Sequence, residues 1–327
     1  MTSSSTPFSS LFVTPSEFHR VLSRTSDCDP NGPRVIPLVA GRKSNVQSFE
    51  AQHVPSSIFF NMDTMRDTSS PYPMMLPTSS QFASYMSQLR IKPDDVLVVY
   101  DPLEPGFYSS PRVAWICRYF GHRAVHILNT FPRYVEEGYP VAEGPANGGP
   151  SGSEVLSGDG DGPDERKNER DSVGSYPESQ LPDPERVVGF EELRGMIKDG
   201  LAQEKEKELK ELQIIDSRPS SRFSGPVDPD LSVLPRGHIP SAINVPFSSL
   251  LGSENTVRSP DELRRVFITA GVKQNVPTVL YCNTGVTAAG LDMALKASGL
   301  AVQTRLYDGS WSEWSKRADR PGEKVCE

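Results

Sequence analysis

Cysteine is scarce in this sequence, and the few cysteines present are scattered. Cys28, Cys117, Cys282 and Cys326 form no C-x-x-C pair, and no histidine-rich segment surrounds any of them in the 327 residues. This pattern argues against a structural zinc site and against a disulfide framework. We therefore expect reduced thiols, no metal site and no cofactor.

Long apolar runs are absent as well. No segment approaches the roughly 20 apolar residues that a membrane-spanning helix needs, and the first ten residues, MTSSSTPFSS, lack the apolar core of a secretory signal. Ser and Thr dominate this start, but the nearby basic residues Arg20 and Arg24 follow or lie within an expected helix over 15–22. The sequence therefore predicts a soluble, cytoplasmic protein, with a mitochondrial location as the alternative.

Basic residues are outnumbered by acidic ones, 34 to 42, which gives a net charge of −8. Such a chain has no general electrostatic attraction for phosphate groups, so we expect neither nucleic acid nor a membrane surface as a direct partner. Hydrophobic residues make up 36% of the chain, which is enough for buried cores. The length favours two domains.

A segment rich in Gly, Pro, Ser and charged residues separates two related halves. Residues 143–182 contain almost nothing apolar and predict a flexible linker. HVPSSI at His53 resembles HIPSAI at His238, and VLVVYD ending at Asp101 resembles PTVLYC ending at Cys282. These repeated sequences indicate an internal duplication, with an N-terminal domain at 8–142 and a C-terminal domain at 183–327.

Within each half, short apolar runs alternate with helical patterns. Residues 96–100 and 276–281 are continuous runs typical of strands that are buried on both faces, and residues 190–201 have the spacing of an amphipathic helix. The alternation predicts an α/β fold in which helices flank a mostly parallel sheet in each domain. Near the end, Ser310 and Glu313 have the spacing of a capping box, with two tryptophans packing into the core behind them.

Cys282 ends the second of these predicted strands, and a short loop and a helix beginning near Ala288 follow it. In open α/β sheets this edge is where ligands bind. Five residues would offer their backbone N–H groups to an anion there, together with the helix dipole: Asn283, Thr284, Gly285, Val286 and Thr287. A thiol at that point ionises easily. Helix capping is the alternative role for the two threonines.

The loop C-N-T-G-V-T-A at Cys282 resembles the active-site loop of tandem rhodanese-type sulfurtransferases. The likeness is greatest to the mercaptopyruvate branch, whose usual loop is Cys-Gly-Ser-Gly-Val-Thr, and it extends over nearly the whole chain outside the linker. Other matching stretches, in the family's order, are HVPSSIFFNMDTMRDTSSPYPMMLP, VVYDPLEPGFYSSPRVAWICRYFGHRAV, IIDSRPSSRFSG, RGHIPSAINVPF and YDGSWSEW.

The resemblance implies two rhodanese-like domains and a reaction in which Cys282 attacks the outer sulfur of a donor. The resulting persulfide is held by the loop amides and is then removed by a thiol acceptor. In the N-terminal copy, Asp101 stands at the nucleophile's position and cannot form a persulfide, so that copy is expected to be inactive.

The choice of donor follows from the residues beside Cys282. Thiosulfate-type members carry basic residues at the next two positions, where this chain has Asn283 and Thr284. A neutral loop with a hydroxyl resembles the mercaptopyruvate branch, in which that hydroxyl works with an Asp and a His. By position Thr284 and Asp63 match the hydroxyl and the Asp, but Met74 replaces the His. We expect 3-mercaptopyruvate as the donor, with thiosulfate as the alternative.

A keto-acid carboxylate needs a cation, preferably an arginine. Arg222 matches the family's first substrate-binding arginine. Leu231 takes the position of the second, although Arg236 is close enough in sequence to serve instead.

The expected acceptor is a thiol, such as thioredoxin, glutathione or a sulfur-carrier protein of a tRNA-thiolation pathway. We expect the protein to act as a monomer.

The sequence argues against three other functions. A phosphatase loop needs an arginine about six residues after its cysteine, where this chain has Ala288. A disulfide oxidoreductase needs a partner cysteine, and only Cys326, at the chain's end, is a candidate. A non-catalytic binding module is a third alternative, against which the complete Cys282 loop argues.

Overall fold

The computed structural model describes residues 7–25, 33–104, 106–145, 175–178, 184–203, 212–224, 237–300, 302–318 and 322–325. The contacts divide the chain into two compact units. We call them the N-terminal unit (Met1–Met65 and Pro77–Pro182) and the C-terminal unit (Arg66–Leu76 and Asp183–Glu327). The predicted domain boundaries remain a prediction, and most of the predicted linker lies outside the described residues.

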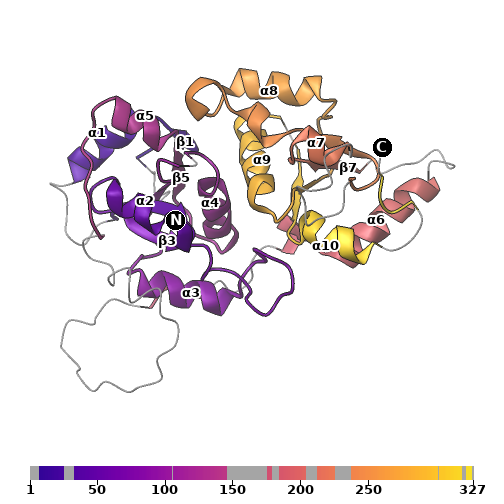
Figure 1. The fold of residues 1–327 in the computed structure, drawn as a ribbon, viewed down its shortest axis with the longest axis horizontal. Helices are drawn as coiled ribbons and strands as arrows, with labels where there is room; N and C mark the ends of the chain where they lie inside the picture. Colours follow the sequence, from indigo (N-terminus) through magenta and orange to yellow (C-terminus); the bar gives the residue numbers. More distant parts are fainter. Residues whose placement is uncertain are drawn as a thin grey trace, which may run out of the picture. The chain divides into compact units, whose positions relative to one another are not determined.

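The N-terminal unit contains a five-stranded sheet whose paired strands are all parallel, in the order β1-β5-β4-β2-β3 (Figure 1). Its strands are β1 (Phe12–Val13), β2 (Val35–Gly41), β3 (Ile58–Asn61), β4 (Val96–Tyr100) and β5 (Val125–Leu128). Its α-helices are α1 (Pro15–Thr25), α2 (Val46–Ala51), α3 (Ser79–Gln88), α4 (Ser110–Tyr119) and α5 (Phe131–Glu136), and a 3-10 turn, η1 (Lys43–Asn45), precedes α2.

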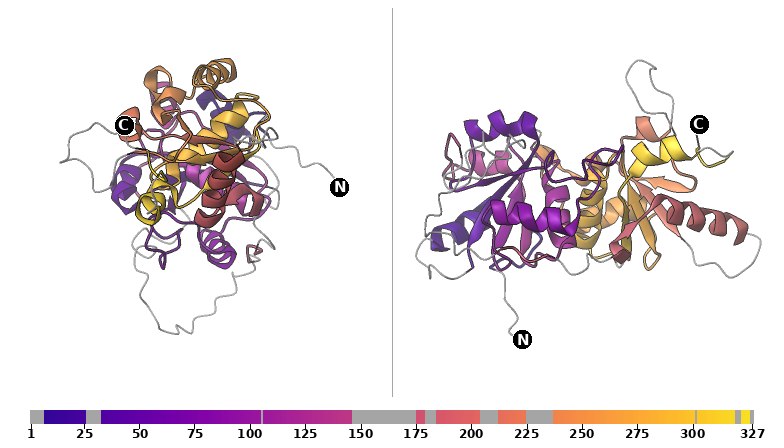
Figure 2. Two further views of the ribbon diagram at one scale, coloured as in Figure 1. Left: turned by 90° about the vertical axis from the view of Figure 1, so that its right-hand side faces the viewer. Right: turned by 90° about the horizontal axis from the view of Figure 1, so that it is seen from below.

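The part of the C-terminal unit from residue 184 onward is coloured from salmon to yellow in Figure 2. This unit repeats the arrangement, with parallel strands in the order β6-β10-β9-β7-β8. Its strands are β6 (Val187–Val188), β7 (Gln213–Asp216), β8 (Ala242–Asn244), β9 (Thr278–Tyr281) and β10 (Thr304–Tyr307). Its α-helices are α6 (Phe190–Gln203), α7 (Ser220–Phe223), α8 (Pro260–Thr269), α9 (Val286–Ala297) and α10 (Ser310–Arg317). Its 3-10 turns are η2 (Pro184–Arg186), η4 (Phe247–Leu250) and η5 (Ser253–Asn255).

The central strands are buried because helices cover both faces of each sheet. Every residue of β4 and of β9 is buried, as expected when a parallel sheet is covered on both sides. In the C-terminal unit, α6 and α10 contribute Phe190, Trp311 and Trp314 to the core on one face. The helix α9 packs closely against η4, since a Cβ at Gly290 would lie 2.4 Å from the Phe247 ring. The predicted α/β fold is confirmed.

Each unit contains a histidine that makes the same two contacts within its own unit. His53 Nδ1 donates to the Phe49 carbonyl at 2.9 Å, and the two rings stack with centroids 4.4 Å apart. In the C-terminal unit His238 Nδ1 donates to the Phe223 carbonyl at 2.9 Å, with stacked rings 3.8 Å apart. The repeated HVPSSI and HIPSAI sequences therefore make equivalent contacts in each sheet.

Part of the predicted linker is docked on the N-terminal unit. Tyr176 is buried, and its hydroxyl donates to His122 Nδ1 at 2.8 Å. That nitrogen is an acceptor because His122 Nε2 donates to the Asp95 carbonyl at 2.8 Å. The Tyr176 ring also meets Phe82 edge-on, with centroids 5.7 Å apart. Residues 175–178 are thus held in place by an aromatic anchor.

None of the described helices combines the length and apolar character needed to cross a bilayer.

A tyrosine hydroxyl completes each core, which gives a test of the repeated architecture. Tyr281 accepts the Ile239 N–H at 3.1 Å, and Tyr100 accepts the Val54 N–H at 2.9 Å. Replacing either tyrosine with Phe leaves a buried amide without its acceptor, so we expect the free energy of unfolding of that unit to fall by about 1–3 kcal/mol. Urea-dependent hydrogen exchange reads the two units separately. Tyr108 is exposed, so Tyr108→Phe is the control, and it should change the free energy of unfolding by less than about 0.5 kcal/mol. An equally small change in Tyr281→Phe would contradict the role of the Tyr281 hydroxyl as the acceptor of the Ile239 N–H.

Candidate active site

Cys282 lies directly after β9, and its side chain is buried, with 3% of the residue exposed. The backbone N–H of Thr284 donates to Cys282 Sγ at 3.4 Å. The helix α9 begins at Val286, two residues earlier than expected. The sulfur therefore accepts a main-chain hydrogen bond from the loop that precedes the positive end of a 12-residue helix.

The loop turns sharply at Gly285, which is the N-cap residue of α9. Its φ is +79°, a left-handed conformation that is costly for a residue with a side chain. The first N–H groups of α9 have no partner within the helix. A four-residue loop, residues 282–285, joins the strand to this helix. A short connection of this kind that leads into a helix N-terminus is well suited to bind an anion.

The start of α10 holds the backbone of Cys282 from the other side. The Cys282 N–H donates to Ser310 Oγ at 3.2 Å, and the Trp311 N–H donates to the Cys282 carbonyl at 2.9 Å. Ser310 Oγ in turn donates to the Tyr307 carbonyl at 2.8 Å. Both main-chain polar groups of the cysteine are thus bound to the segment that follows β10.

The predicted capping box at Ser310 and Glu313 is wrong. Gly309 is the N-cap residue of α10, and the Ser310 hydroxyl bonds to Tyr307 and Cys282 instead. Glu313 Oε2 accepts the Tyr307 hydroxyl at 2.9 Å. The prediction that the two tryptophans of α10 pack in the core is borne out by their burial.

The helix-capping alternative for the two threonines is also wrong, because the N-cap of α9 is Gly285. Thr287 is the second residue of the helix. Its hydroxyl lies 2.8 Å from that of Ser217, which follows β7. This hydrogen bond links the loop after β7 to the first turn of α9 at the carboxyl edge of the sheet.

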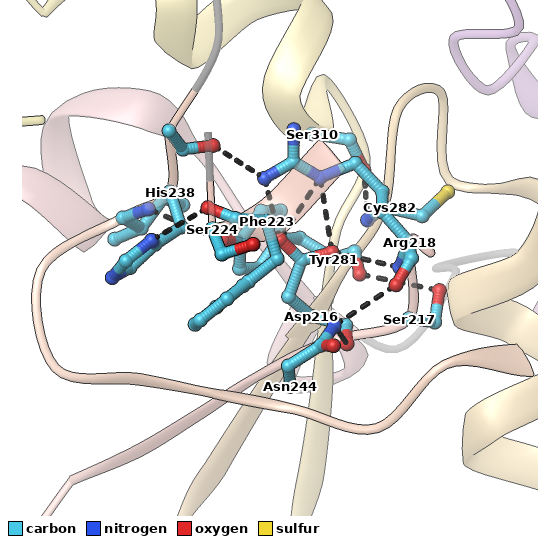
Figure 3. A network of polar contacts seen from close by, with 12 residues as sticks. Asp216, Ser217, Arg218, Phe223, Ser224, His238, Asn244, Tyr281, Cys282 and Ser310 are labelled. Atoms are coloured by element: carbon cyan, nitrogen blue, oxygen red, sulfur yellow. Dashed lines mark hydrogen bonds and ion pairs between the residues drawn. The ribbon is translucent and has the colours of Figure 1, made fainter. Parts of the chain in front are cut away.

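A buried ion pair supports this edge (Figure 3). Arg218 donates to Asp216 through Nε and Nη2, with the shortest distance, 2.6 Å, from Nη2 to Oδ2. Nη2 also donates to the Gly237 carbonyl at 2.7 Å. The guanidinium lies over the Trp311 ring, 4.5 Å from its centroid, and 5.6 Å from that of Tyr281. The pair therefore joins the end of β7 to Tyr281, which precedes Cys282, and to Trp311, whose N–H binds the Cys282 carbonyl.

Comparison with known proteins identifies the family. A model of the rhodanese-like domain matches residues 192–317. Thiosulfate sulfurtransferase of Rattus norvegicus is 34% identical over 281 residues, covering 85% of this chain and 82% of that protein. The human 3-mercaptopyruvate sulfurtransferase is 32% identical over 282 residues, covering 86% and 82%. The chain belongs to the rhodanese-like sulfurtransferases.

The solved structures agree with this assignment. The Tum1 protein of Saccharomyces cerevisiae superposes with a TM-score of 0.76 at 29% identity, covering 97% of this sulfurtransferase and 98% of that chain. The predicted resemblance to tandem rhodanese-type enzymes, with two rhodanese-like domains, is therefore confirmed.

The N-terminal unit of the sulfurtransferase has a carboxylate where the C-terminal unit has its thiol. Asp101 follows β4 and is buried, and it accepts the N–H groups of Ser109 at 2.5 Å and of Ser110 at 2.9 Å. Burial raises the pKa of this carboxyl, while the hydrogen bonds from Ser110 and its neighbours oppose the shift. The amides at the start of α4 are thus bound by a side chain of the unit itself.

The other predicted site residues lie in different parts of the chain. Arg222 is half-buried in α7, in the same unit as Cys282, whereas Arg236 and Leu231 are outside the described residues. Asp63 belongs to the N-terminal unit. Its carboxylate accepts Arg42 Nε at 2.8 Å and the Lys43 N–H at 2.9 Å.

Met74, which replaces the family's histidine, belongs to the segment Arg66–Leu76 of the C-terminal unit. At the end of this segment the Leu76 N–H donates to Asp308 Oδ2 at 2.7 Å. The residue at the histidine's position is therefore carried by a segment that is bonded next to the start of α10. In the described part of the chain, no group of three or more His, Cys, Asp or Glu residues is placed to hold a metal ion.

Sequence reasoning missed the residues that support the site from neighbouring strands. Asp216, Ser217 and Arg218 follow β7, and Ser310 follows β10. The available signal was that the carboxyl ends of adjacent parallel strands meet at one edge, so that polar residues after each strand come together there. The matched stretches IIDSRPSSRFSG and YDGSWSEW contain all four.

Removing the cation of the buried pair tests its structural role. Arg218→Met leaves the Asp216 carboxylate buried without its partner, so we expect the free energy of unfolding of the C-terminal unit to fall by about 3–5 kcal/mol. The double variant Asp216→Leu/Arg218→Met removes both charges and should recover most of this loss. Urea unfolding of the C-terminal unit measures both effects, and a single variant as stable as the wild type would show that the pair does not hold this edge together.

Proposed function

We propose that this sulfurtransferase moves a sulfane sulfur from 3-mercaptopyruvate to a thiol acceptor through a persulfide on Cys282. The hydrogen bond from the Thr284 N–H to Cys282 Sγ is the observation that carries the proposal. A hydrogen bond to sulfur at the start of a helix stabilises the thiolate, which is the nucleophilic form. We propose that the same N–H also stabilises the persulfide anion.

The proposed reaction has two steps. In the first, the Cys282 thiolate attacks the donor's sulfur, an S–S bond forms, and the donor's C–S bond breaks. The electron pair of that bond goes to carbon as an enolate, which gains a proton to give pyruvate. In the second, an acceptor thiolate attacks the outer sulfur, and Cys282 leaves as the thiolate. The cysteine is thus regenerated without an external oxidant or reductant.

The residues beside Cys282 favour a keto-acid donor over thiosulfate. Asn283 and Thr284 bring no positive charge for a small dianion, and we propose that Arg222 binds the donor's carboxylate. Relatives named for each donor match this chain at similar identity, 34% and 32%, so the preference rests on these side chains. Thiosulfate is the alternative donor, and a sulfur-carrier protein is the alternative acceptor.

The family resemblance implies a proton relay that includes Thr284 and Asp63. We propose that the Thr284 hydroxyl takes part in proton transfer and that Asp63 does not. The backbone of Thr284 already lies against the sulfur, so its hydroxyl is carried by the same loop. The Asp63 carboxylate binds Arg42 and Lys43 in the N-terminal unit. These contacts favour a role in the turn after β3.

Replacing the nucleophile provides the main test. Cys282→Ser should not gain mass on treatment with 3-mercaptopyruvate and should release no pyruvate, whereas the wild type becomes heavier by one sulfur. Cys117→Ser is a matched control, because burial raises the pKa of the Cys117 thiol to about 12 and leaves it unreactive. Intact-mass spectrometry and pyruvate release measure both steps, and sulfur uptake by Cys282→Ser would refute the assignment.

The role of Arg222 is tested by the donor's affinity. Arg222→Ala should raise KM for 3-mercaptopyruvate by roughly 5- to 150-fold, which corresponds to about 1–3 kcal/mol for a lost charged hydrogen bond. Arg222→Lys keeps the positive charge but loses the bidentate hydrogen-bond geometry. Its KM for 3-mercaptopyruvate should therefore lie between those of the wild type and Arg222→Ala. Steady-state assays with both donors measure the effect. An unchanged KM in the Ala variant would remove Arg222 from the donor site.

A further inference from the structure

The peptide between Asn283 and Thr284 is held at both ends. On one side, the Asn283 carbonyl accepts two hydrogen bonds from a single residue of α10: the Ser312 N–H at 3.0 Å and the Ser312 hydroxyl at 2.6 Å. On the other side, the Thr284 N–H of the same peptide donates to Cys282 Sγ at 3.4 Å. The reactive sulfur and Ser312 therefore face opposite ends of one peptide group.

Peptide geometry connects these two contacts. In a planar trans peptide the C=O and N–H bonds point in opposite directions, so fixing the direction of the carbonyl also fixes that of the N–H. Two donors from Ser312 restrict rotation of the carbonyl more than one would. They also polarise the peptide, and hydrogen bonds in a chain strengthen one another by about 10–30% each.

Among the described residues, the Ser312 hydroxyl has the Asn283 carbonyl as its one hydrogen-bond partner. The residue is 3% exposed, and a carbonyl oxygen only accepts, so the Ser312 hydroxyl is the donor in this 2.6 Å contact. Water has little access to replace it. Ser310, by comparison, bonds to the Cys282 N–H and the Tyr307 carbonyl, and so acts on a different peptide.

We propose that Ser312 is a positioning residue for the sulfur transfer, with its hydroxyl aiming the Thr284 N–H at the Cys282 sulfur. This inference rests on the proposed function in that it takes Cys282 as the nucleophile. The hydrogen bonds of Ser312 to this loop go to the Asn283 carbonyl and not to the sulfur. Ser312 acts through the Asn283–Thr284 peptide, and its contribution is to favour the ionised over the neutral sulfur.

The test is the pH profile of Cys282 alkylation in the full chain. Iodoacetamide reacts with the thiolate, and peptide mass spectrometry separates Cys282 from the other cysteines. Ser312→Ala keeps the backbone donor but loses the hydroxyl, so the midpoint of the profile should rise by about 0.5–1 unit. Alkylation below the midpoint should then be roughly 3- to 10-fold slower. Ser312→Thr retains a hydroxyl and should restore the wild-type profile.

The chain provides a matched control on the same helix. Ser315 is 4% exposed, and its hydroxyl has no hydrogen-bond partner among the residues that the structure describes. Ser315→Ala therefore removes a buried hydroxyl from α10 without removing a hydrogen bond, and the midpoint should stay at its wild-type value. If Ser312→Ala does not fold, as judged by circular dichroism, Ser312→Val takes its place, because valine has the shape of the threonine in Ser312→Thr without its hydroxyl.

The outcomes separate this inference from the proposed function. An unshifted midpoint in the hydroxyl-free variants, or an equal shift in Ser315→Ala, overturns the positioning role even if sulfur uptake persists. A shift that Ser312→Thr reverses supports it. If that shift is found while wild-type Cys282 takes up no sulfur from any donor, the positioning role holds and the sulfur-transfer proposal falls.

Discussion

Hydrogen bonds between the segment after β10 and the two residues after β9 determine where the Cys282 sulfur lies. Cys282 and Asn283 have their main-chain groups bonded to residues at the start of α10. These bonds depend on the parallel register of the two strands, in which Leu306 pairs with Leu280. The core tryptophans of α10 fix the helix against the sheet. The hydrophobic core thereby sets the direction of a few amide groups.

The same frame accommodates different chemistry in the two units. In each, a buried strand leads into a loop and a helix whose first amides have no partner within the helix. Asp101 satisfies two such amides with its own carboxylate, whereas the Cys282 thiol occupies the corresponding place with a smaller, softer group. The Asp101 carboxylate accepts two N–H groups, whereas the Cys282 sulfur accepts the single N–H of Thr284. One side chain thus distinguishes the two turns.

The sequence predicted the fold and the position of Cys282 because both follow from local patterns. Runs of buried β-branched residues gave β4 as Val96–Tyr100 and all of β9, with two residues too many at its start, and helical spacing gave the start of α6. The failed predictions involve contacts distant in sequence. Ser310 does not cap its helix, since its hydroxyl bonds to a residue 28 positions away. Spacing alone likewise gave no indication that Arg218 lies over the Trp311 ring, or that the segment Arg66–Leu76 belongs to the C-terminal unit.

The contacts of Tyr176 attach the chain after residues 146–174 to the N-terminal unit. Residues 145 and 175, on either side of residues 146–174, both belong to the N-terminal unit. Both described ends of this stretch are therefore attached to one unit. Doubling the number of residues between two fixed attachment points costs only about 0.6 kcal/mol in closure entropy. A reporter sequence inserted between residues 145 and 175 should therefore cost the N-terminal unit little of its stability.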